Sequence, residues 1–172
     1  MAHSTLWAPW RIDYILNKDE KDARTRDQGC LFCRLLGENR DRENLILERT
    51  RHSFVMLNRY PYSNGHLLIL PQTHAADLDE LGNEAYIDLM LLLKKSVKAL
   101  QQAVNPAGVN AGLNMGEAAG AGIAEHLHFH VVPRWRGDHN FMPVIADTMV
   151  MPQHLASTYE MLKPYFIEES NN

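Results

Sequence analysis

The stretch of sequence that decides the fold is His126-Leu127-His128-Phe129-His130-Val131-Val132-Pro133-Arg134-Trp135. Its three histidines alternate with apolar residues, and this period of two predicts a β-strand, in which successive side chains point to opposite faces. The three imidazoles are therefore expected to share one face of a sheet. Histidine titrates near neutral pH, binds metals and acts as a nucleophile, acid or base. The sequence thus predicts an active site here rather than a merely polar strand face.

Two kinds of chemistry fit three imidazoles on one strand. They could hold a catalytic zinc ion with one open coordination position, or one histidine could be a nucleophile that the others orient. The loop before the strand contains Gly116, Gly120 and Gly122. Glycine lets backbone N–H groups approach phosphate oxygens closely, so this loop favours chemistry at phosphorus, although it could also be a plain connection.

Length and composition are those of a single globular domain. The chain has 172 residues, of which 45% are hydrophobic and 22% are charged, and this length allows a sizeable core. The net charge of −4 provides no overall basic field, so nucleic acid is not an expected partner. No apolar stretch is long enough to cross a bilayer, and the N-terminus does not have the pattern of a secretory signal. We therefore expect a cytoplasmic protein without membrane contact.

The hydrophobic patterns predict an α+β fold. Besides the histidine strand, the expected strands are 45–49, 52–58, 66–71 and 109–114. A long helix is expected over 84–103 with Asn83 as its cap, and an amphipathic helix over about 152–166. Together these elements predict an antiparallel sheet of about five strands with one long helix and a C-terminal helix. The long helix is apolar over more than one face, which indicates burial against a second subunit.

The only two cysteines, Cys30 and Cys33, form a C-x-x-C pair. Without an export signal, a structural disulfide is not expected. Metal binding and redox chemistry are the two remaining interpretations.

The sequence resembles the histidine triad superfamily of nucleotide hydrolases and transferases. Residues 126–132 match its His-φ-His-φ-His-φ-φ signature, in which φ is apolar, and residues 57–71 resemble its Asn/Asp-turn-Gly-His-strand-Pro segment. The flanks at 6–11 and 130–141 are similar to a zinc-binding bacterial branch, the diadenosine tetraphosphate phosphorylases.

The resemblance also implies the organisation of the chain. It predicts a histidine triad domain over residues 28–135. Residues 1–27 would form an N-terminal aromatic arm and polar loop, and residues 136–172 a C-terminal loop and helix packing on the same domain. Because the family forms homodimers, a dimer is expected.

Individual roles follow from the resemblance. His128 would attack the α-phosphorus of a nucleoside phosphate and form a nucleotidyl-histidine intermediate. His130 would contact the phosphoryl oxygens, and His66 would orient the site. The expected substrate contacts are Asn58 for the ribose, Asn114 beside the phosphate, and the backbone N–H groups of Gly120, Gly122 and Ile123. Most family members carry Gln-Ser or Gln-Thr before the triad, which this sequence lacks, so backbone groups would hold the phosphate.

The resemblance further implies a structural zinc ion, with the ligands Cys30, Cys33, His74 and His126. A closed set of four Cys and His ligands with C-x₂-C spacing is typical of structural zinc. The redox interpretation of the cysteine pair is the alternative. No organic cofactor is expected.

The expected activity is cleavage of a dinucleoside polyphosphate, diadenosine tetraphosphate above all, by phosphorolysis through His128. The substrate would be bound by its AMP moiety. Two alternatives stay open. One is a nucleoside phosphoramidate or adenylyl-conjugate hydrolase of the same fold, and the other is a nucleotide-binding scaffold with weak catalysis. The sequence does not decide between phosphate and water as the acceptor.

Overall fold

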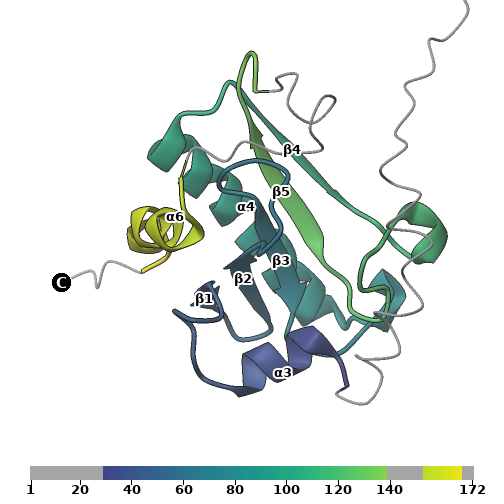
Figure 1. Cartoon of the computed structure of the whole chain (residues 1–172). Coiled ribbons are helices and arrows are strands. Elements are labelled where there is room, and N and C mark those ends of the chain that lie inside the picture. The colour runs from purple at the N-terminus through teal and green to yellow at the C-terminus, as the bar shows by residue number, and fades with distance from the viewer. Residues whose placement is uncertain (1–28, 139–152, 168–172) are drawn as a thin grey trace, which may run out of the picture.

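The computed structural model describes residues 29–138 and 153–167. In this part of the chain, a five-stranded antiparallel sheet carries a long helix on one face and a short helix on the other (Figure 1). The predicted α+β architecture with five strands is confirmed. The predicted aromatic arm at 1–27, including the flank at 6–11, lies outside the described residues.

The strands are short and follow the predicted meander. They are β1 (Ile46–Arg49), β2 (Ser53–Leu57), β3 (Leu67–Pro71), β4 (Gly108–Leu113) and β5 (Phe129–Arg134). Their order in the sheet is β1-β2-β3-β5-β4, with every pair antiparallel. The order places β5, which carries the last triad histidine, between β3 and the edge strand β4.

Three α-helices and three short 3₁₀ segments surround the sheet in the part of the chain that the structure describes. The α-helices are α3 (Leu31–Gly37), α4 (Asn83–Val104) and α6 (Leu155–Leu162). The 3₁₀ segments are η2 (Leu78–Glu80), η3 (Glu117–Ala119) and η4 (Lys163–Phe166). None of the helices described is long and apolar enough to cross a membrane.

Each face of the sheet buries its own apolar cluster, because side chains alternate along every strand. On the α4 side, Leu57, Leu67 and Ile69 pack against the helix residues Leu92 and Leu100. On the α3 side, the single ring of Phe32 closes a smaller cluster. That smaller cluster contains Ile46, Phe54, Met56, Leu68 and Leu70. The long helix α4 therefore covers one face of the sheet, and the short helix α3 covers the other.

The histidine strand begins three residues later than predicted. β5 starts at Phe129, which pairs with Ile69, and the ladder with β3 does not extend to the first two histidines. The physical reason is Pro71 at the end of β3, because proline has no N–H to donate to a ladder. Leu127 N–H donates instead to the carbonyl of Ala75 at 2.7 Å. Leu127 is still buried against the α4 cluster, so the predicted alternation of faces survives without regular strand pairing.

Both predicted helix starts need correction. Asn83 is the first residue of α4 rather than its cap, and Gly82 occupies the N-cap without a side-chain hydrogen bond. Glycine is accepted at this position because it adopts the extended N-cap conformation readily. The C-terminal α6 starts at Leu155, not near 152, and continues into η4.

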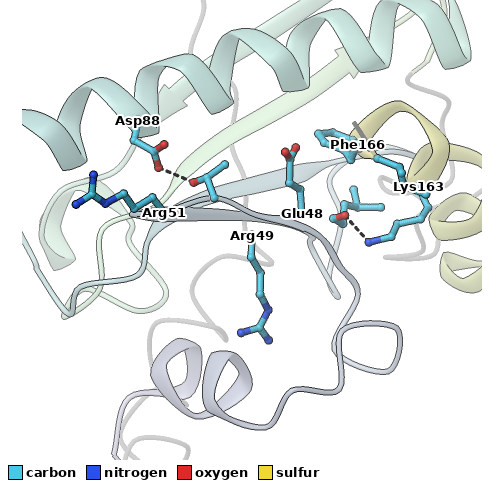
Figure 2. Close-up of a pocket in the computed structure, with 9 residues that line it drawn as sticks. Glu48, Arg49, Arg51, Asp88, Lys163 and Phe166 are labelled. Atoms are coloured by element: carbon cyan, nitrogen blue, oxygen red, sulfur yellow. Dashed lines mark hydrogen bonds between the residues drawn. The ribbon is translucent and has the colours of Figure 1, made fainter. Parts of the chain in front are cut away.

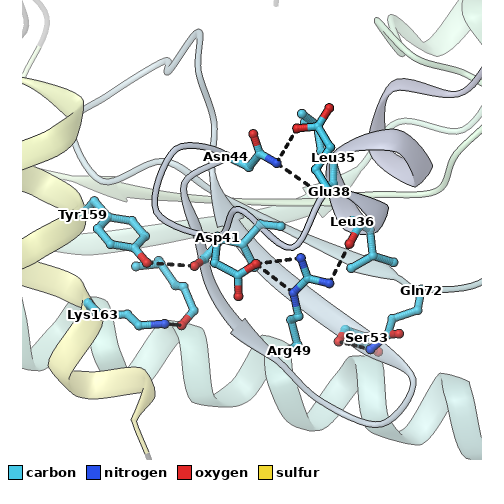
Figure 3. A network of polar contacts seen from close by, with 12 residues as sticks. Leu35, Leu36, Glu38, Asp41, Asn44, Arg49, Ser53, Gln72, Tyr159 and Lys163 are labelled. Carbon is cyan, nitrogen blue, oxygen red and sulfur yellow. Dashed lines mark hydrogen bonds and ion pairs between the residues drawn. The ribbon is translucent and has the colours of Figure 1, made fainter. Parts of the chain in front are cut away.

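The C-terminal helix is attached to the first strand by two side chains that reach backbone carbonyls. Tyr159 Oη–H donates to the carbonyl of Ile46 at 3.1 Å, and Lys163 Nζ donates to that of Leu47 at 2.6 Å (Figure 3). The apolar side chains of Tyr159, Leu162 and Phe166 join the α4 cluster. These contacts place α6 and η4 on the same hydrophobic core as the sheet.

Gly65 sets the backbone just before His66 and gives a test of the fold. Its φ is +81°, and a Cβ here would lie 3.3 Å from Leu100 Cδ2. A left-handed conformation costs a side-chain-bearing residue about 1–2 kcal/mol, so Gly65→Ala is expected to lower the free energy of unfolding by about this amount. Urea denaturation followed by circular dichroism measures it. Gly112→Ala is the control because a Cβ added there would meet open space. Equal stability of the two variants would contradict the expectation.

Candidate active site and metal centre

Three histidines expected to carry the chemistry lie in a row of touching rings. The centroids of His128 and His130 are 5.0 Å apart, and those of His130 and His66 are 5.1 Å apart. His130 lies on β5, and His66 directly precedes the neighbouring β3. The structure thus brings His66 beside His128 and His130, which lie more than sixty positions later in the sequence. His130 pairs with Leu68, which belongs to the cluster under α3, and the ring centroids of Phe32 and His128 are 5.4 Å apart, so the row lies on the face on which α3 packs.

The tautomer of His128 follows from its backbone contact. Its Nδ1 lies 2.8 Å from the carbonyl oxygen of His126. Because a carbonyl oxygen only accepts hydrogen bonds, Nδ1 must carry the proton. In the neutral ring, Nε2 is then left with a lone pair, which is the requirement for a nucleophile.

His66 and His130 are linked by hydrogen bonds whose donors and acceptors can be assigned. The backbone N–H of Tyr62 donates to His66 Nδ1 at 3.1 Å, so the proton of His66 is on Nε2. His66 Nε2 lies 2.9 Å from His130 Nδ1 and donates to it. The neutral ring of His130 then carries its proton on Nε2. It offers an N–H donor, which is suited to a phosphate oxygen, on a ring whose centroid is 5.0 Å from that of His128.

Burial keeps these rings neutral. Desolvation lowers the pKa of His128 below its usual value of 6.5. Desolvation first, and then the nearby rings of His130 and His128, lower the pKa of His66 to about 3. The pKa of His130 falls to about 4, mainly through burial and then through His128. At neutral pH the row therefore contains uncharged imidazoles, and the tautomer assignments above apply.

A second cluster, the Cys/His cluster, consists of Cys30, Cys33, His74 and His126, and one ligand atom from each lies within 4.8 Å of all the others. His126 Nε2 donates to the carbonyl of Pro71 at 3.0 Å, which leaves Nδ1 unprotonated. That Nδ1 faces Cys30 Sγ at 3.3 Å and Cys33 Sγ at 3.5 Å. The predicted quartet is therefore assembled, with a free nitrogen lone pair pointing at two sulfurs.

The distances in the Cys/His cluster suit a tetrahedral metal ion. Zinc–sulfur bonds of about 2.3 Å and zinc–nitrogen bonds of about 2.0–2.1 Å separate neighbouring S and N ligands by about 3.6 Å. The Cys33 Sγ–His74 Nδ1 distance is 3.5 Å, close to this value. Burial and then the adjacent Cys30 raise the pKa of the Cys33 thiol to about 11. A cation would be needed to hold this group as a thiolate at neutral pH.

The helix that carries the cysteines is held at its other end by polar contacts with β1. α3 has only seven residues, too few for a stable isolated helix. Arg49 pairs with Asp41 at 2.6 Å and also donates to the carbonyl of Leu36 at 2.7 Å (Figure 3). Asn44 Nδ2 donates to the carbonyl of Leu35 at 3.0 Å. These bonds position α3, and with it Cys30 and Cys33, relative to the sheet.

The groups expected to bind the substrate differ in how many hydrogen bonds they already make within the protein. Asn58 Oδ1 accepts from the N–H of Tyr60 at 3.0 Å, and Asn58 Nδ2 lies 3.3 Å from His66 Nδ1, so this side chain already supports the turn and the histidine row. Asn114 follows β4 directly and is half-buried. In the glycine loop, the N–H of Gly120 donates to Glu117 at 2.9 Å and closes η3. This bond occupies one of the backbone groups expected to hold phosphate.

Tyr62 is a residue that the sequence analysis did not single out. Its ring stacks on His130 with centroids 5.8 Å apart and an angle of 19° between the planes, and it lies 4.7 Å from His66. In the sequence it belonged to a turn. The signal that could have found it is an aromatic residue four positions before a histidine that already belonged to the site.

A cavity of about 570 Å³ lies elsewhere, between the end of β1, α4 and η4 (Figure 2). Its lining includes Glu48, Asp88, Lys163 and Phe166. Glu48 is paired with Lys95 at 2.7 Å and Asp88 accepts from the hydroxyl of Thr50. None of the described residues that line this cavity is a histidine. The cavity lies on the α4 face of the sheet, so it is separate from the histidine row on the other face.

Comparison with known proteins identifies the family. The HIT domain, the histidine triad domain, matches residues 39–137 of the chain. The chain belongs to the HIT domain family. An AP-4-A phosphorylase of Mycobacterium tuberculosis is 35% identical over 158 residues, covering 91% of this chain and 81% of that protein. An adenosine 5′-monophosphoramidase of Schizosaccharomyces pombe is 34% identical over 105 residues, covering 61% of this chain and 74% of that protein.

Solved structures agree on the fold of this HIT domain. A zinc-bound histidine triad family protein from Mycobacterium smegmatis superposes with a TM-score of 0.64 at 23% identity, over 80% of this chain and 93% of that one. A histidine triad nucleotide-binding protein from Sulfolobus tokodaii gives 0.62 at 25% identity, over 80% and 89%. With named enzymes among its relatives, the protein is an enzyme of the HIT family.

Proposed function

We propose that this HIT protein cleaves a dinucleoside polyphosphate, diadenosine tetraphosphate above all, by transferring a nucleotidyl group through His128 to inorganic phosphate. The single observation that carries the proposal is the Nδ1–H bond from His128 to the carbonyl of His126, which leaves Nε2 free to attack. The similarity to AP-4-A phosphorylase over 91% of the chain supports the choice of substrate and acceptor.

The proposed reaction has two balanced transfers. First, His128 Nε2 attacks the α-phosphorus, and the bond from that phosphorus to the bridging oxygen breaks. AMP is then bonded to His128, and ATP leaves with the electron pair of the broken bond. Second, an oxygen of inorganic phosphate attacks the same phosphorus, breaks the P–N bond and releases ADP. The imidazole returns to its neutral form, ready for the next substrate.

Two groups would stabilise charge on the phosphoryl oxygens. The Nε2–H of His130 is held in place through His66, which costs no rearrangement when the reaction occurs. Because Gly120 N–H is bonded to Glu117, the backbone donors proposed for the phosphate narrow to Gly122 and Ile123. Asn58 and Asn114 stay proposed contacts for the ribose and the phosphate.

A second candidate function is hydrolysis of a nucleoside phosphoramidate or an adenylyl conjugate. The similarity to an adenosine 5′-monophosphoramidase favours it, although that match covers less of the chain. The same nucleophile would act, and water would replace phosphate as the acceptor. A nucleotide-binding scaffold with weak catalysis is the third candidate, and it predicts tight AMP binding with slow turnover on every substrate.

Product analysis separates these functions. With diadenosine tetraphosphate and inorganic phosphate, we expect ADP and ATP, and little cleavage without phosphate. His128→Ala should reduce kcat/KM by about three orders of magnitude or more, because the nucleophile is lost. AMP and ATP formed without phosphate would show hydrolysis. Faster cleavage of adenosine 5′-phosphoramidate would favour the second candidate. Unchanged turnover in the His128→Ala variant would exclude the nucleophile.

We also propose that the Cys/His cluster holds a structural zinc ion. The residues fit, since two sulfurs and an unprotonated His126 Nδ1 already converge at distances suited to a tetrahedral site. A bound zinc ion would supply positive charge that holds the thiols as thiolates. Its four ligands would tie α3 to the segment that leads into β5 and fix His126, whose carbonyl orients the nucleophile.

Removal of one ligand tests the zinc proposal. Cys33→Ser should reduce the zinc content of the purified protein from equimolar to well below, and should lower Tm, because the site would lose a thiolate. His154→Ala, which changes an exposed histidine away from the cluster, should retain zinc. Elemental analysis and thermal denaturation measure both effects. A wild-type protein that is folded without zinc would refute the site, and a reversible Cys30–Cys33 disulfide would favour the redox alternative.

We also propose that the protein forms a homodimer through α4. Ile87 and Leu91 lie one turn apart on this helix with 57% and 60% of their surfaces exposed, so an apolar stripe faces away from the sheet. Leu91→Glu should convert a dimer into a monomer in sedimentation velocity measurements. Ala156→Glu, which adds the same charge at an exposed position of α6, should leave it unchanged. A monomeric wild-type protein would refute the dimer.

A further inference from the structure

Tyr62 contacts the histidine row and is also exposed to solvent. Its ring lies against His66 and stacks on His130, yet 57% of the residue's surface is exposed. The turn between β2 and β3 therefore presents a flat aromatic surface to solvent right beside the row. A ligand that covered this ring would remove a large apolar area from water, which favours binding.

The ring of Tyr62 is not needed for the described hydrophobic core. It belongs to neither of the two apolar clusters. The contribution of this residue to the turn comes from its backbone, whose N–H donates to His66. By contrast, Phe32, which also contacts a triad ring, is only 4% exposed and fills the smaller cluster. Of these two aromatic rings, only that of Tyr62 has a surface available to a ligand.

We propose that Tyr62 is a stacking platform for the base of the leaving nucleoside of a dinucleoside polyphosphate. This inference rests on the proposed function and adds a specificity-determining residue to it. Every nucleobase has a π-face, so a base can stack on an aromatic side chain whatever its identity. Tyr62 would therefore recognise the presence of a second nucleoside, whichever base it carries.

The order of the rings assigns Tyr62 to the leaving side. The rings follow one another as His128, His130 and Tyr62, with contacts of 5.0 and 5.8 Å. The retained nucleoside is bonded to the phosphorus that His128 attacks. The leaving nucleoside is separated from that phosphorus, whose oxygens His130 would contact, by three further phosphates. A platform one ring beyond His130 therefore matches the more distant base.

Two substrates that share the reacting phosphorus test the platform. Diadenosine tetraphosphate has a leaving nucleoside, and adenosine 5′-phosphoramidate has none. For the full-length protein, Tyr62→Ala should lower kcat/KM by about 10-fold on diadenosine tetraphosphate, in the range found for loss of one base–aromatic contact. It should change the phosphoramidate value by less than about 2-fold. Tyr62→Phe should behave like wild type on both substrates, because the ring stays.

The controls separate stacking from positioning and from the proposed function. Tyr165→Ala removes a partly exposed tyrosine from η4 and should change neither substrate. An equal loss on both substrates in Tyr62→Ala would overturn the platform, since it would show that the ring only positions His130. In the His128→Ala background, calorimetry with diadenosine tetraphosphate and AMP gives a readout without turnover. Tyr62→Ala should weaken only the dinucleotide there, even if the proposed reaction is wrong, and equal affinities would refute the platform.

Discussion

The hydrogen bond from Nδ1 of His128 to the carbonyl of His126 is the interaction on which the site depends. It fixes the proton on the nitrogen that points into the protein and leaves the lone pair on the other. The same residue that supplies the carbonyl presents its own Nδ1 to two cysteine sulfurs. One backbone segment thus joins the Cys/His cluster to His128, the proposed nucleophile, so a contact that fixes the ring of His126 also fixes the carbonyl that orients His128.

The two faces of the sheet differ: the α4 face contains the larger apolar core, and the α3 face contains the histidine row and the Cys/His cluster. The α4 face buries most of the large aliphatic side chains, each of which contributes about 1.5–3 kcal/mol when fully buried. The α3 face buries few side chains, and α3 is held by the Cys/His cluster at one end and by Arg49 and Asp41 at the other. A metal ion bound by the Cys/His cluster would strengthen the attachment of α3 to the sheet.

The alternation in the histidine stretch was enough to predict which side chains face the site, but not the start of the strand. Leu127 and Phe129 face α4 as expected, yet Pro71 on the partner strand ends the ladder before His128. A single strand's sequence carries no information about a proline across the sheet. The same limit applies to Tyr62, whose contact with His130 depends on two strands meeting. The Cys/His quartet came from a family resemblance, and the structure brings its four ligand atoms together. The roles of Asn58, Asn114 and the glycine loop stay predictions.

The most direct test of the account is a search for the covalent intermediate. The protein would be mixed rapidly with diadenosine tetraphosphate in the absence of phosphate, quenched at alkaline pH, which preserves a P–N bond, and analysed by intact and peptide mass spectrometry. We expect a mass increase of one adenylyl group located on His128, which disappears when phosphate is added before the quench. Turnover without any adduct, or an adduct on another residue, would contradict it.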